Sequence, residues 1–430
     1  MATIVLGVQW GDEGKGKLID ALLAGDSNFR LCCRAAGGDN AGHTVVVKGT
    51  TYDFHIIPSG LLSPNCINLI GSGTVVNIPS FFRELKKLQD GGLDTDGRLF
   101  ISDRAHVVFD LHQLADRLEE EELGKGNIGT TKRGIGPCYS TKAARSGARI
   151  GDIFDKEILE HKLRTIHHTF EQRYGKEQLK GYSVNEEIAR FDTYRETLAS
   201  FVVDQVPLIA SAQESNQPIL VEGANALLLD IDAGTYPMVT SSNTGLGGCF
   251  TGLSISPFKL KDIVGVVKAY TTRVGSGPFP TEQADNEIGK TLQSVGHEVG
   301  VTSGRPRRCG WFDLVLAKYS THINHYTAFN LTKLDVLDAF DEIQVCTAYK
   351  VGGEEVPSFP AGLKMLETLE CTYETLPGWG GKLGGKTAGC KRWDDLPENA
   401  RKYVEWIERS TGVKVRWIGT GPAREDLIVR

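Results

Sequence analysis

A short glycine-rich segment near the N-terminus carries two lysines and two carboxylates. Gly11-Asp12-Glu13-Gly14-Lys15-Gly16-Lys17 lies between an apolar run, residues 3–8, and a helix-like run that begins at Leu18. A strand, a glycine-rich turn and a helix start together present backbone N–H groups and a helix N-terminus to a phosphate. Lys15 and Lys17 add positive charge for the phosphate oxygens. The segment therefore predicts a phosphate-binding loop.

The loop departs from the usual nucleotide-binding pattern at one position. The spacing Gly11-x4-Gly16-Lys17 fits the Walker motif, but Leu18 stands where Ser or Thr would hold Mg²⁺. Asp12, inside the loop, offers a replacement oxygen ligand for Mg²⁺ and is also placed to act as a base. We expect Asp12 to serve in one or both of these roles.

A second motif, Thr332-Lys333-Leu334-Asp335, follows an apolar run and suits a purine base. The Lys333 stem can pack on the ring, while the Asp335 carboxylate accepts from the N1–H and N2–H₂ of guanine. Adenine offers no such donor pair, so the motif favours GTP. Gly419-Thr420-Gly421, at the end of another predicted strand, is a candidate second wall for the base.

A third cluster, residues 37–44, has two interpretations. Asp39-x-x-Gly42 matches the D-x-x-G motif of switch GTPases, although it follows the phosphate loop closely for that class. Alternatively, His43 is a general acid beside Asp12, acting on the same phosphoryl group. The residues alone leave both interpretations open.

Further polar segments point to additional anionic substrates. The loop of residues 129–137 is basic and dense in glycine, and residues 302–308 place three arginines beside Thr302 and Ser303. Residues 222–225 and 240–243 add amides and hydroxyls next to tight turns. Arginine binds carboxylates and phosphates bidentately. Two anion clusters besides the phosphate loop favour a three-substrate site over a GTP switch. A basic loop of this kind could instead contact RNA.

Composition narrows the class of protein. The chain has 430 residues, 40% of them hydrophobic, and a net charge of −6, so no overall basic field indicates nucleic-acid binding. No apolar run approaches the roughly 20 residues of a membrane span. The nine cysteines are scattered without a C-x-x-C pair, which predicts reduced thiols in a cytoplasmic protein. Because a strand is expected from Thr3, we expect no targeting leader.

The elements that must position these residues alternate between strands and helices. We predict strands at residues 3–8, 30–35, 44–47, 68–70, 99–101, 218–222, 263–269, 328–332, 342–349 and 414–419. Helices are predicted at residues 106–123, 156–174, 186–210, 311–324 and 399–411, and the acidic run 119–122 is interpreted as a solvated helix face. This alternation predicts an α/β fold, a single large domain over residues 1–430 whose mostly parallel central sheet is covered by helices.

Eight motifs in order resemble those of the adenylosuccinate synthetase family. They are QWGDEGKGK, NAGHT, GTTxRGIGP, EGA, DIDxGTYPxVTSSN, TRVGxGPFPTE, TSGRPRRCGW and TKLDVLD, and the resemblance runs from Val5 to Arg424. It implies a P-loop-NTPase-related fold and a homodimer. It also implies a ligase that joins IMP to L-aspartate with GTP and Mg²⁺, through 6-phosphoryl-IMP, and so commits IMP to AMP synthesis.

The resemblance also implies site residues. Asp12 would remove the N1 proton of IMP so that O6 attacks the γ-phosphate of GTP, His43 would donate to the developing charge, and Lys15 would stabilise the phosphoryl group. Mg²⁺ would be held in each subunit by Asp12 and the Gly42 carbonyl. GTP contacts are implied for Gly11, Asp12, Glu13, Gly14, Lys15, Gly16, Lys17, Gly42, His43, Thr44, Arg307, Lys333, Leu334, Asp335, Gly419, Thr420 and Gly421. IMP contacts are implied for Asp12, Lys15, Asn40, Ala41, Gly42, His43, Thr131, Asn225, Thr240 and Arg305, and for Arg145 of the partner subunit. Aspartate contacts are implied for Val301, Thr302, Ser303, Gly304, Arg305 and Arg307.

Some positions depart from common family choices. Asp39 stands where Asn or His is expected, and Asn225 stands where bacterial members carry Gln; Lys132, Ser303 and Gly419 also differ. None of these changes removes a catalytic group, so they bear on affinity and not on the type of reaction. A GTP-binding switch or scaffold stays as the alternative function, whereas a dinucleotide dehydrogenase would need G-x-G-x-x-G at the first turn.

Overall fold

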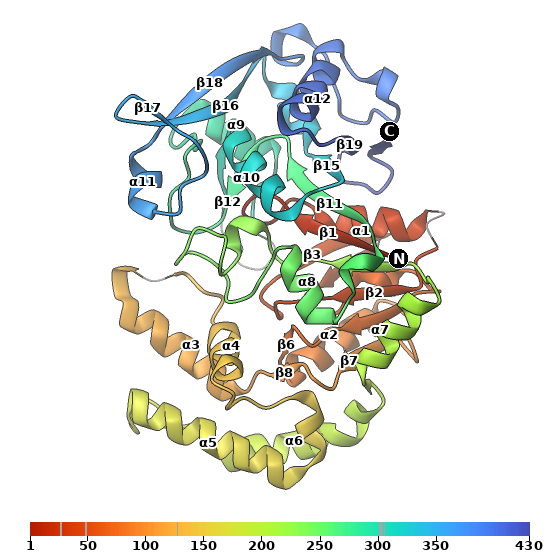
Figure 1. Ribbon diagram of the computed structural model, residues 1–430, viewed down its shortest axis with the longest axis vertical. Helices are drawn as coiled ribbons and strands as arrows, with labels where there is room; N and C mark the ends of the chain where they lie inside the picture. Colours follow the sequence, from red (N-terminus) through yellow and green to blue (C-terminus); the bar gives the residue numbers. More distant parts are fainter. Residues whose placement is uncertain (26–27, 48–49, 127, 301–303, 305) are drawn as a thin grey trace.

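Ten strands of the computed structural model form one central sheet (Figure 1). The structure describes residues 1–430 except 26–27, 48–49, 127, 301–303 and 305, and describes His43, Thr44, Val46 and Lys125 by their backbone alone. In spatial order the strands are β20 (Leu427–Val429), β19 (Val415–Gly419), β15 (Ala328–Thr332), β11 (Leu260–Lys268), β1 (Ala2–Gly7), β10 (Ile219–Glu222), β2 (Leu31–Arg34), β5 (Ile67–Ile70), β7 (Leu99–Ser102) and β9 (Val202–Val203).

Every neighbouring pair in this sheet is parallel except β19 and β20, which run antiparallel. All six residues of β1 are buried, as expected for a strand covered on both faces. The mostly parallel α/β sheet predicted from the sequence is therefore confirmed. Because parallel strands share one carboxyl edge, the loops that follow β1, β2, β10, β11, β15 and β19 all open on the same side of the sheet.

Twelve α-helices among the described residues surround the sheet and extend beyond it. They are α1 (Lys15–Ala24), α2 (Ile78–Asp90), α3 (Asp110–Leu123), α4 (Ile135–Ala143), α5 (Lys156–Tyr174), α6 (Val184–Ala199), α7 (Gln205–Glu214), α8 (Leu246–Leu253), α9 (Glu287–Val295), α10 (Leu314–Asn324), α11 (Leu363–Thr368) and α12 (Glu398–Thr411). Figure 1 shows α5 and α6 at one end of the molecule and α11 and α12 towards the other. No helix of the described part combines the length and apolar character needed to cross a membrane.

Two predicted strands lie outside the central sheet. The strand predicted at residues 44–47 is β3 (His43–Val47), whose one strand partner among the described residues is β4 (Thr50–Phe54), antiparallel to it. The strand predicted at residues 342–349 is β16 (Glu342–Val351), which pairs antiparallel with β17 (Glu354–Val356) and β18 (Glu370–Pro377) and parallel with β14 (Phe312–Asp313). Both have partly exposed partners, β4 and β18, which suits a sheet that faces solvent on one side.

Three predicted helix boundaries are wrong, each because a short strand precedes or interrupts the helix. The helix predicted at residues 186–210 is two helices, α6 and α7, separated by β9, and the Asp204 side chain caps α7. The helix predicted at residues 106–123 begins only at Asp110, because residues 106–107 form β8 (His106–Val107), which pairs with β6 (Val75–Val76). Asp313 caps α10, which therefore begins at Leu314. The remaining two predicted helices match α5 and α12 to within one residue.

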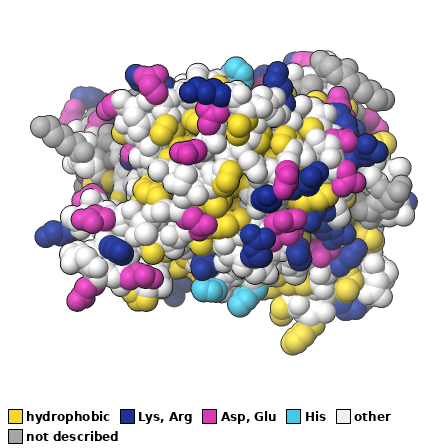
Figure 2. Space-filling model, turned by 90° about the horizontal axis from the view of Figure 1, so that it is seen from above, with side chains coloured by type: hydrophobic (Ala, Val, Ile, Leu, Met, Phe, Trp, Pro, Cys, Tyr) yellow, Lys and Arg dark blue, Asp and Glu magenta, His cyan; other side chains and the backbone are white. Residues whose placement is uncertain are grey.

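All nine cysteines are free thiols, as predicted, and seven of them are buried. Acidic and basic side chains are interspersed with apolar ones on the face in Figure 2, so this face carries no large field of one sign. The expectation of a single domain over residues 1–430 stays a prediction.

Candidate active site

The predicted site segments meet at the carboxyl edge of the central sheet. The phosphate loop follows β1, residues 37–42 follow β2, and residues 223–225 follow β10. Lys333 follows β15, and Thr420 follows β19. The strand order places β1 at the centre of this group, between β11 and β10. Segments far apart in sequence are therefore brought to one edge of the sheet by the topology alone.

The phosphate loop has the backbone needed to surround an anion. Gly11, Asp12 and Gly14 have φ angles of 93°, 58° and 94°, and α1 begins directly afterwards at Lys15. Successive left-handed residues curl the chain so that N–H groups face inwards, next to the positive end of the helix dipole. Gly16 is buried in the first turn.

Glu13 stabilises this loop from inside. Its carboxylate is buried and accepts hydrogen bonds from the Gln9 and Gly11 N–H groups at 3.1 and 2.8 Å. The Lys15 ammonium lies 3.1 Å from the same carboxylate. Glu13 is thus committed to shaping the loop, while Lys15 is held at its rim with its side chain 13% exposed.

The guanine motif lies against the phosphate loop. The Thr332 hydroxyl donates to the Glu13 carbonyl at 2.7 Å, and a side chain at Gly419 would lie 3.4 Å from the Thr332 Cα. Lys333 has a φ of 61° and donates to the Gly296 carbonyl at 2.7 Å, and Leu334 is buried. Burial raises the pKa of Asp335, and Lys333 and Lys17 partly oppose this effect. The two predicted walls of a base pocket are therefore neighbours.

Lys17 ties the phosphate loop to the C-terminal wall. Its ammonium donates to the carbonyls of Gly421 at 2.6 Å and Asp426 at 2.7 Å. Burial lowers the pKa of Lys17 to about 8, with Asp426 and Asp335 acting in the opposite direction. The Thr420 hydroxyl faces away from this contact and donates to the Cys390 carbonyl.

Asp12 is paired with an arginine that is distant from it in sequence. The Arg307 Nε lies 2.7 Å from Asp12 Oδ2, and Arg307 Nη1 lies 2.7 Å from Glu298 Oε2. The Glu298 carboxylate also pairs with Lys268, at the end of β11. Sequence reasoning found Asp12 and Arg307 but missed Glu298 and Lys268, because these two pair with each other across 30 residues of sequence.

Asn40, Thr240 and Asn225 form a second polar group near the loop that follows β2. The Asn40 amide donates to the Thr240 hydroxyl at 3.5 Å and its oxygen accepts from the Gly38 N–H at 3.1 Å. Asn225 has a φ of 59°, and its side-chain oxygen is buried without a hydrogen-bond partner in the described part of the chain. Such an oxygen is expected to meet a ligand donor.

The segment that joins Asn40 to β3 leaves no room for a side chain at Gly42. Ala41 and Gly42 lead from Asn40 into β3, and a Cβ at Gly42 would lie 2.6 Å from His55 Nδ1. The predictions for the side chains of His43 and Thr44 lie outside what the structure describes.

The glycine-rich loop around Thr131 is held by buried carboxylates of α3. Glu120 accepts from the N–H groups of Ile128, Gly129 and Thr130, and Asp116 accepts from the Thr130 hydroxyl and the Gly134 N–H. Interpretation of residues 119–122 as a solvated face is therefore wrong for Glu120, which is 7% exposed. The Thr131 side chain itself is exposed.

Asp39 is compensated within the chain. Arg133 lies 3.3 Å from the Asp39 carboxylate and also donates to its carbonyl at 2.5 Å. The departure from Asn or His at this position thus comes with a counter-ion from the loop of residues 129–137.

Four of the predicted aspartate contacts, Val301, Thr302, Ser303 and Arg305, lie outside the described residues. Gly304 is described and exposed, with a φ of 62°. Arg145 follows α4 and is exposed, and the described residues give its side chain no ion-pair partner.

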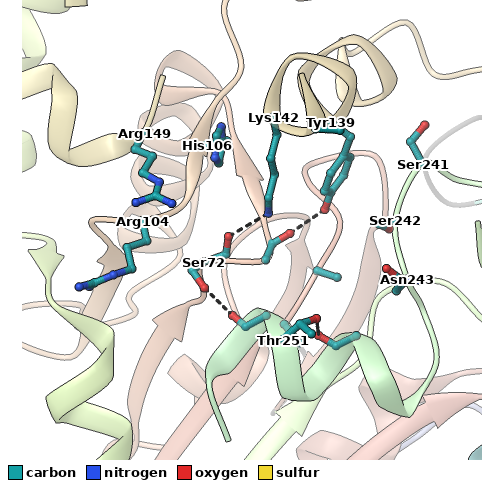
Figure 3. Close-up of a pocket in the computed structure, with 16 residues that line it drawn as sticks. Ser72, Arg104, His106, Tyr139, Lys142, Arg149, Ser241, Ser242, Asn243 and Thr251 are labelled. Carbon is teal, nitrogen blue, oxygen red and sulfur yellow. Dashed lines mark hydrogen bonds between the residues drawn. The ribbon is translucent and has the colours of Figure 1, made fainter. Parts of the chain in front are cut away.

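A cavity of about 520 Å³ lies beside residues 241–243 (Figure 3). Lys142 and Tyr139 reach into it from α4 and donate to the carbonyls of Ser72 at 3.4 Å and Gly73 at 2.8 Å. Burial, together with Lys142 and Arg149, lowers the pKa of His106 in its wall to about 4. The sequence analysis noted residues 241–243 in the lining of this cationic cavity but not its lysine, arginines and histidine, because these come from separate segments, and none of the individually assigned GTP, IMP or aspartate contacts lines it.

Comparison with known proteins agrees with the geometry. The family model described as adenylosuccinate synthetase matches residues 4–428. The chain is similar to adenylosuccinate synthetases of Phaeosphaeria nodorum, 62% identical over all of this chain and 98% of that protein, and of Pyrenophora tritici-repentis, 61% identical over all of this chain and 99% of that one. It is also similar to a fully ligated adenylosuccinate synthetase from Plasmodium falciparum, with a TM-score of 0.92 and 42% identity over 100% of this chain and 99% of that one. A cyanophage S-2L succinoaminodeoxyadenylate synthetase (TM-score 0.60, 18% identity, over 100% of this chain and 95% of that one) shares the fold.

Proposed function

The chain belongs to the adenylosuccinate synthetase family, and from this premise we propose how its residues carry out the family's reaction. The enzyme joins IMP to L-aspartate in the synthesis of AMP, with GTP as the co-substrate. One observation carries the proposal. The phosphate loop, the guanine motif and the polar residues Asn40, Thr240 and Asn225, which we call the IMP wall, meet at one edge of the sheet.

We assign the first step to Asp12. As a base it takes the N1 proton of IMP, and O6 then attacks the γ-phosphorus of GTP to give 6-phosphoryl-IMP and GDP. Lys15 and His43 stabilise the charge on the transferring group. The aspartate amine then displaces phosphate from C6. The position of Asp12 at the loop mouth, 29% exposed, supports this role.

GTP is held by residues 11–17, by Gly42, His43, Thr44 and Arg307, and by the base pocket of Lys333, Leu334, Asp335, Gly419, Thr420 and Gly421. Asp335 accepts from the guanine N–H groups while Lys333 covers the ring. The contact between Thr332 and Glu13 supports this arrangement, because it fixes the distance between the base pocket and the phosphate loop.

IMP contacts Asn40, Ala41, Gly42, Thr131, Asn225, Thr240 and Arg305. The unpartnered oxygen of Asn225 supports this assignment, because a purine donor would satisfy it. L-Aspartate contacts Gly304, Arg305, Arg307 and residues 301–303. Arginine forks at these positions suit its two carboxylates.

We further propose a homodimer in which Arg145 of the partner subunit completes the IMP site. The exposure of Arg145 supports this, since the side chain is free to reach another chain. A cytoplasmic location is proposed from the nine free cysteines, which fit a reducing compartment.

Mg²⁺ fits this site as a partner of the phosphates. No three His, Cys, Asp or Glu side chains of the described residues gather to hold a metal ion alone. The Asp12 carboxylate, partly exposed, and the Gly42 carbonyl would hold Mg²⁺, with phosphate oxygens completing the coordination. When bound, Mg²⁺ neutralises charge on the transferring phosphoryl group.

Phosphate release from GTP tests the proposal. With Mg²⁺ present, IMP and aspartate are each added or omitted, and the ultraviolet spectrum is followed for a 6-substituted purine. Release that needs both substrates supports the assignment. Slow release that ignores both would support the alternative of a GTP-binding switch.

A further inference from the structure

Four side chains of alternating charge form a row from the phosphate loop into the core. Asp12, Arg307, Glu298 and Lys268 are joined by contacts of 2.7, 2.7 and 2.8 Å. Arg307 is 8% exposed, and Glu298 and Lys268 are at most 1% exposed. Only Asp12, at the open end, is substantially accessible. We call this set the charge row.

The inner end of the charge row is fixed. Lys268 closes β11, a strand within the central sheet, and donates to both Glu298 oxygens and to the Thr272 hydroxyl at 2.8 Å. The Tyr270 hydroxyl also donates to Glu298. Burial alone would raise the pKa of Glu298, but Lys268, Lys333 and Arg307 together lower it to about 2. Glu298 is therefore an ionised carboxylate held from three directions.

Arg307, in the middle of the charge row, ends the segment of residues 301–307 that contains the predicted aspartate contacts. Val299 and Pro306 form an antiparallel bridge, and the Arg307 N–H donates to the Glu298 carbonyl at 2.9 Å. Gln293 donates to the Arg307 carbonyl at 2.8 Å. The backbone thus fixes the Cα position of Arg307, while Glu298 holds its guanidinium from the buried side and Asp12 contacts it from the exposed side.

We propose that Glu298 is a positioning residue of the ligase reaction, which aims the Arg307 guanidinium at Asp12 across the mouth of the phosphate loop. The inference rests on the proposed roles of Asp12 and Arg307. The competing explanation is that Glu298 only neutralises the buried Lys268, in which case its effect on catalysis would follow its effect on stability.

The first variant is Glu298→Gln in the full-length enzyme. Because Arg307 loses its anchor, kcat is expected to fall about 100-fold, as for a displacement of about 1 Å in a reacting group. The KM for IMP should stay within about threefold, since Asp12 is the only proposed IMP contact in the charge row and Glu298→Gln leaves it in place. The melting temperature should fall by roughly 5–10 °C, because Lys268 is left unpaired.

Glu408→Gln is the matched control. Glu408 is also a buried carboxylate between an arginine and a lysine, Arg430 at 3.1 Å and Lys414 at 3.4 Å. It accepts from the N–H of Val415, the first residue of β19, and so lies at the sheet edge opposite the site. This variant should lose stability while its kcat stays within about twofold of wild type.

The double variant Lys268→Met/Glu298→Gln separates the two explanations. Removing both charges should restore most of the melting temperature. If Glu298 positions Arg307, kcat stays low in this stable protein. Recovery of kcat together with the melting temperature would overturn the proposal. Tyr270→Phe, which keeps every charge of the row, should lower kcat by about 3–10-fold and covers the case in which neither Glu298 variant folds.

Asp12→Asn distinguishes failure of this inference from failure of the proposed function. If Asp12→Asn keeps wild-type activity, the base assignment is wrong whatever the Glu298 variants do. If Asp12→Asn is inactive and Glu298→Gln has normal kcat, the base assignment stands and the positioning role of Glu298 is wrong.

Discussion

The ammonium of Lys17 lies 2.6 Å from the carbonyl oxygen of Gly421, so the phosphate loop and the C-terminal wall of the base pocket are held together by one side chain. Lys17 also donates to the Asp426 carbonyl. The lysine of the Walker-like motif therefore has a structural contact in addition to any phosphate contact.

Lys17→Met should raise the KM for GTP by at least about tenfold, because the wall loses its tether and the phosphates lose a charge. The unfolding free energy should fall by about 1–3 kcal/mol. Steady-state kinetics and urea unfolding measure the two effects. Lys391→Met is the control, since Lys391 contacts Glu425 and Asp426 but not the phosphate loop. Equal effects of both variants on the KM for GTP would argue against the tether.

Asp335→Asn should weaken recognition of the guanine 2-amino group. Loss of a charged acceptor for two N–H groups is expected to raise the KM for GTP by about 10–100-fold. ITP, which lacks the 2-amino group, should be affected less, so the ratio of kcat/KM for GTP over ITP should fall. An unchanged ratio would remove Asp335 from the base pocket.

Mixed dimers test the shared site. Arg145→Ala and Arg305→Leu should each inactivate the homodimer, because each removes an IMP contact from every site. Mixed in equal amounts and allowed to exchange, half of the dimers would be heterodimers with one intact site each, giving about a quarter of wild-type activity. If activity stays at the level of the separate variants, Arg145 does not act across the interface.

His112 should make stability depend on pH. The ring is buried, accepts from the Phe109 N–H at 3.0 Å and contacts the Thr141 hydroxyl at 3.1 Å. Burial, with a smaller contribution from His106, lowers its pKa to about 3. Between pH 6.5 and 3 the unfolded chain binds a proton at this position that the folded chain does not, so stability decreases as the pH falls.

From pH 7 to pH 5 this histidine should cost about 2 kcal/mol of unfolding free energy. Urea unfolding of wild type and of His112→Asn at both pH values measures it, since other groups titrate equally in both proteins. The decrease with falling pH should be about 2 kcal/mol smaller in His112→Asn. Parallel pH dependence in the two proteins would show that His112 keeps an ordinary pKa in the fold.

The central sheet and its site segments could be predicted because their signals are local. An apolar run followed by glycine and polar residues marks the carboxyl end of a buried strand, as at β1, β2 and β10. The parallel arrangement then brings these ends together without any knowledge of side-chain contacts.

The buried ion pairs could not be predicted, because their partners are distant in sequence. Lys268 ends an apolar strand, and nothing near it indicates that Glu298 will neutralise it. Glu120 likewise belongs to an acidic run in which Glu121 and Glu122 are exposed, and Glu122 pairs with Arg173. Short strands such as β9 failed for a different reason, since two residues carry no periodicity.

The place of β19 at residues 415–419 has a consequence for synthesis of the protein. The phosphate loop is among the first segments made. The proposed C-terminal wall of the base pocket and the Gly421 carbonyl, to which Lys17 donates, are among the last. A chain still growing on the ribosome therefore lacks one side of the nucleotide pocket, whatever its N-terminal half has already folded. On the proposed assignment of residues 419–421 to the guanine pocket, the nucleotide pocket is complete only when nearly the whole chain has been made.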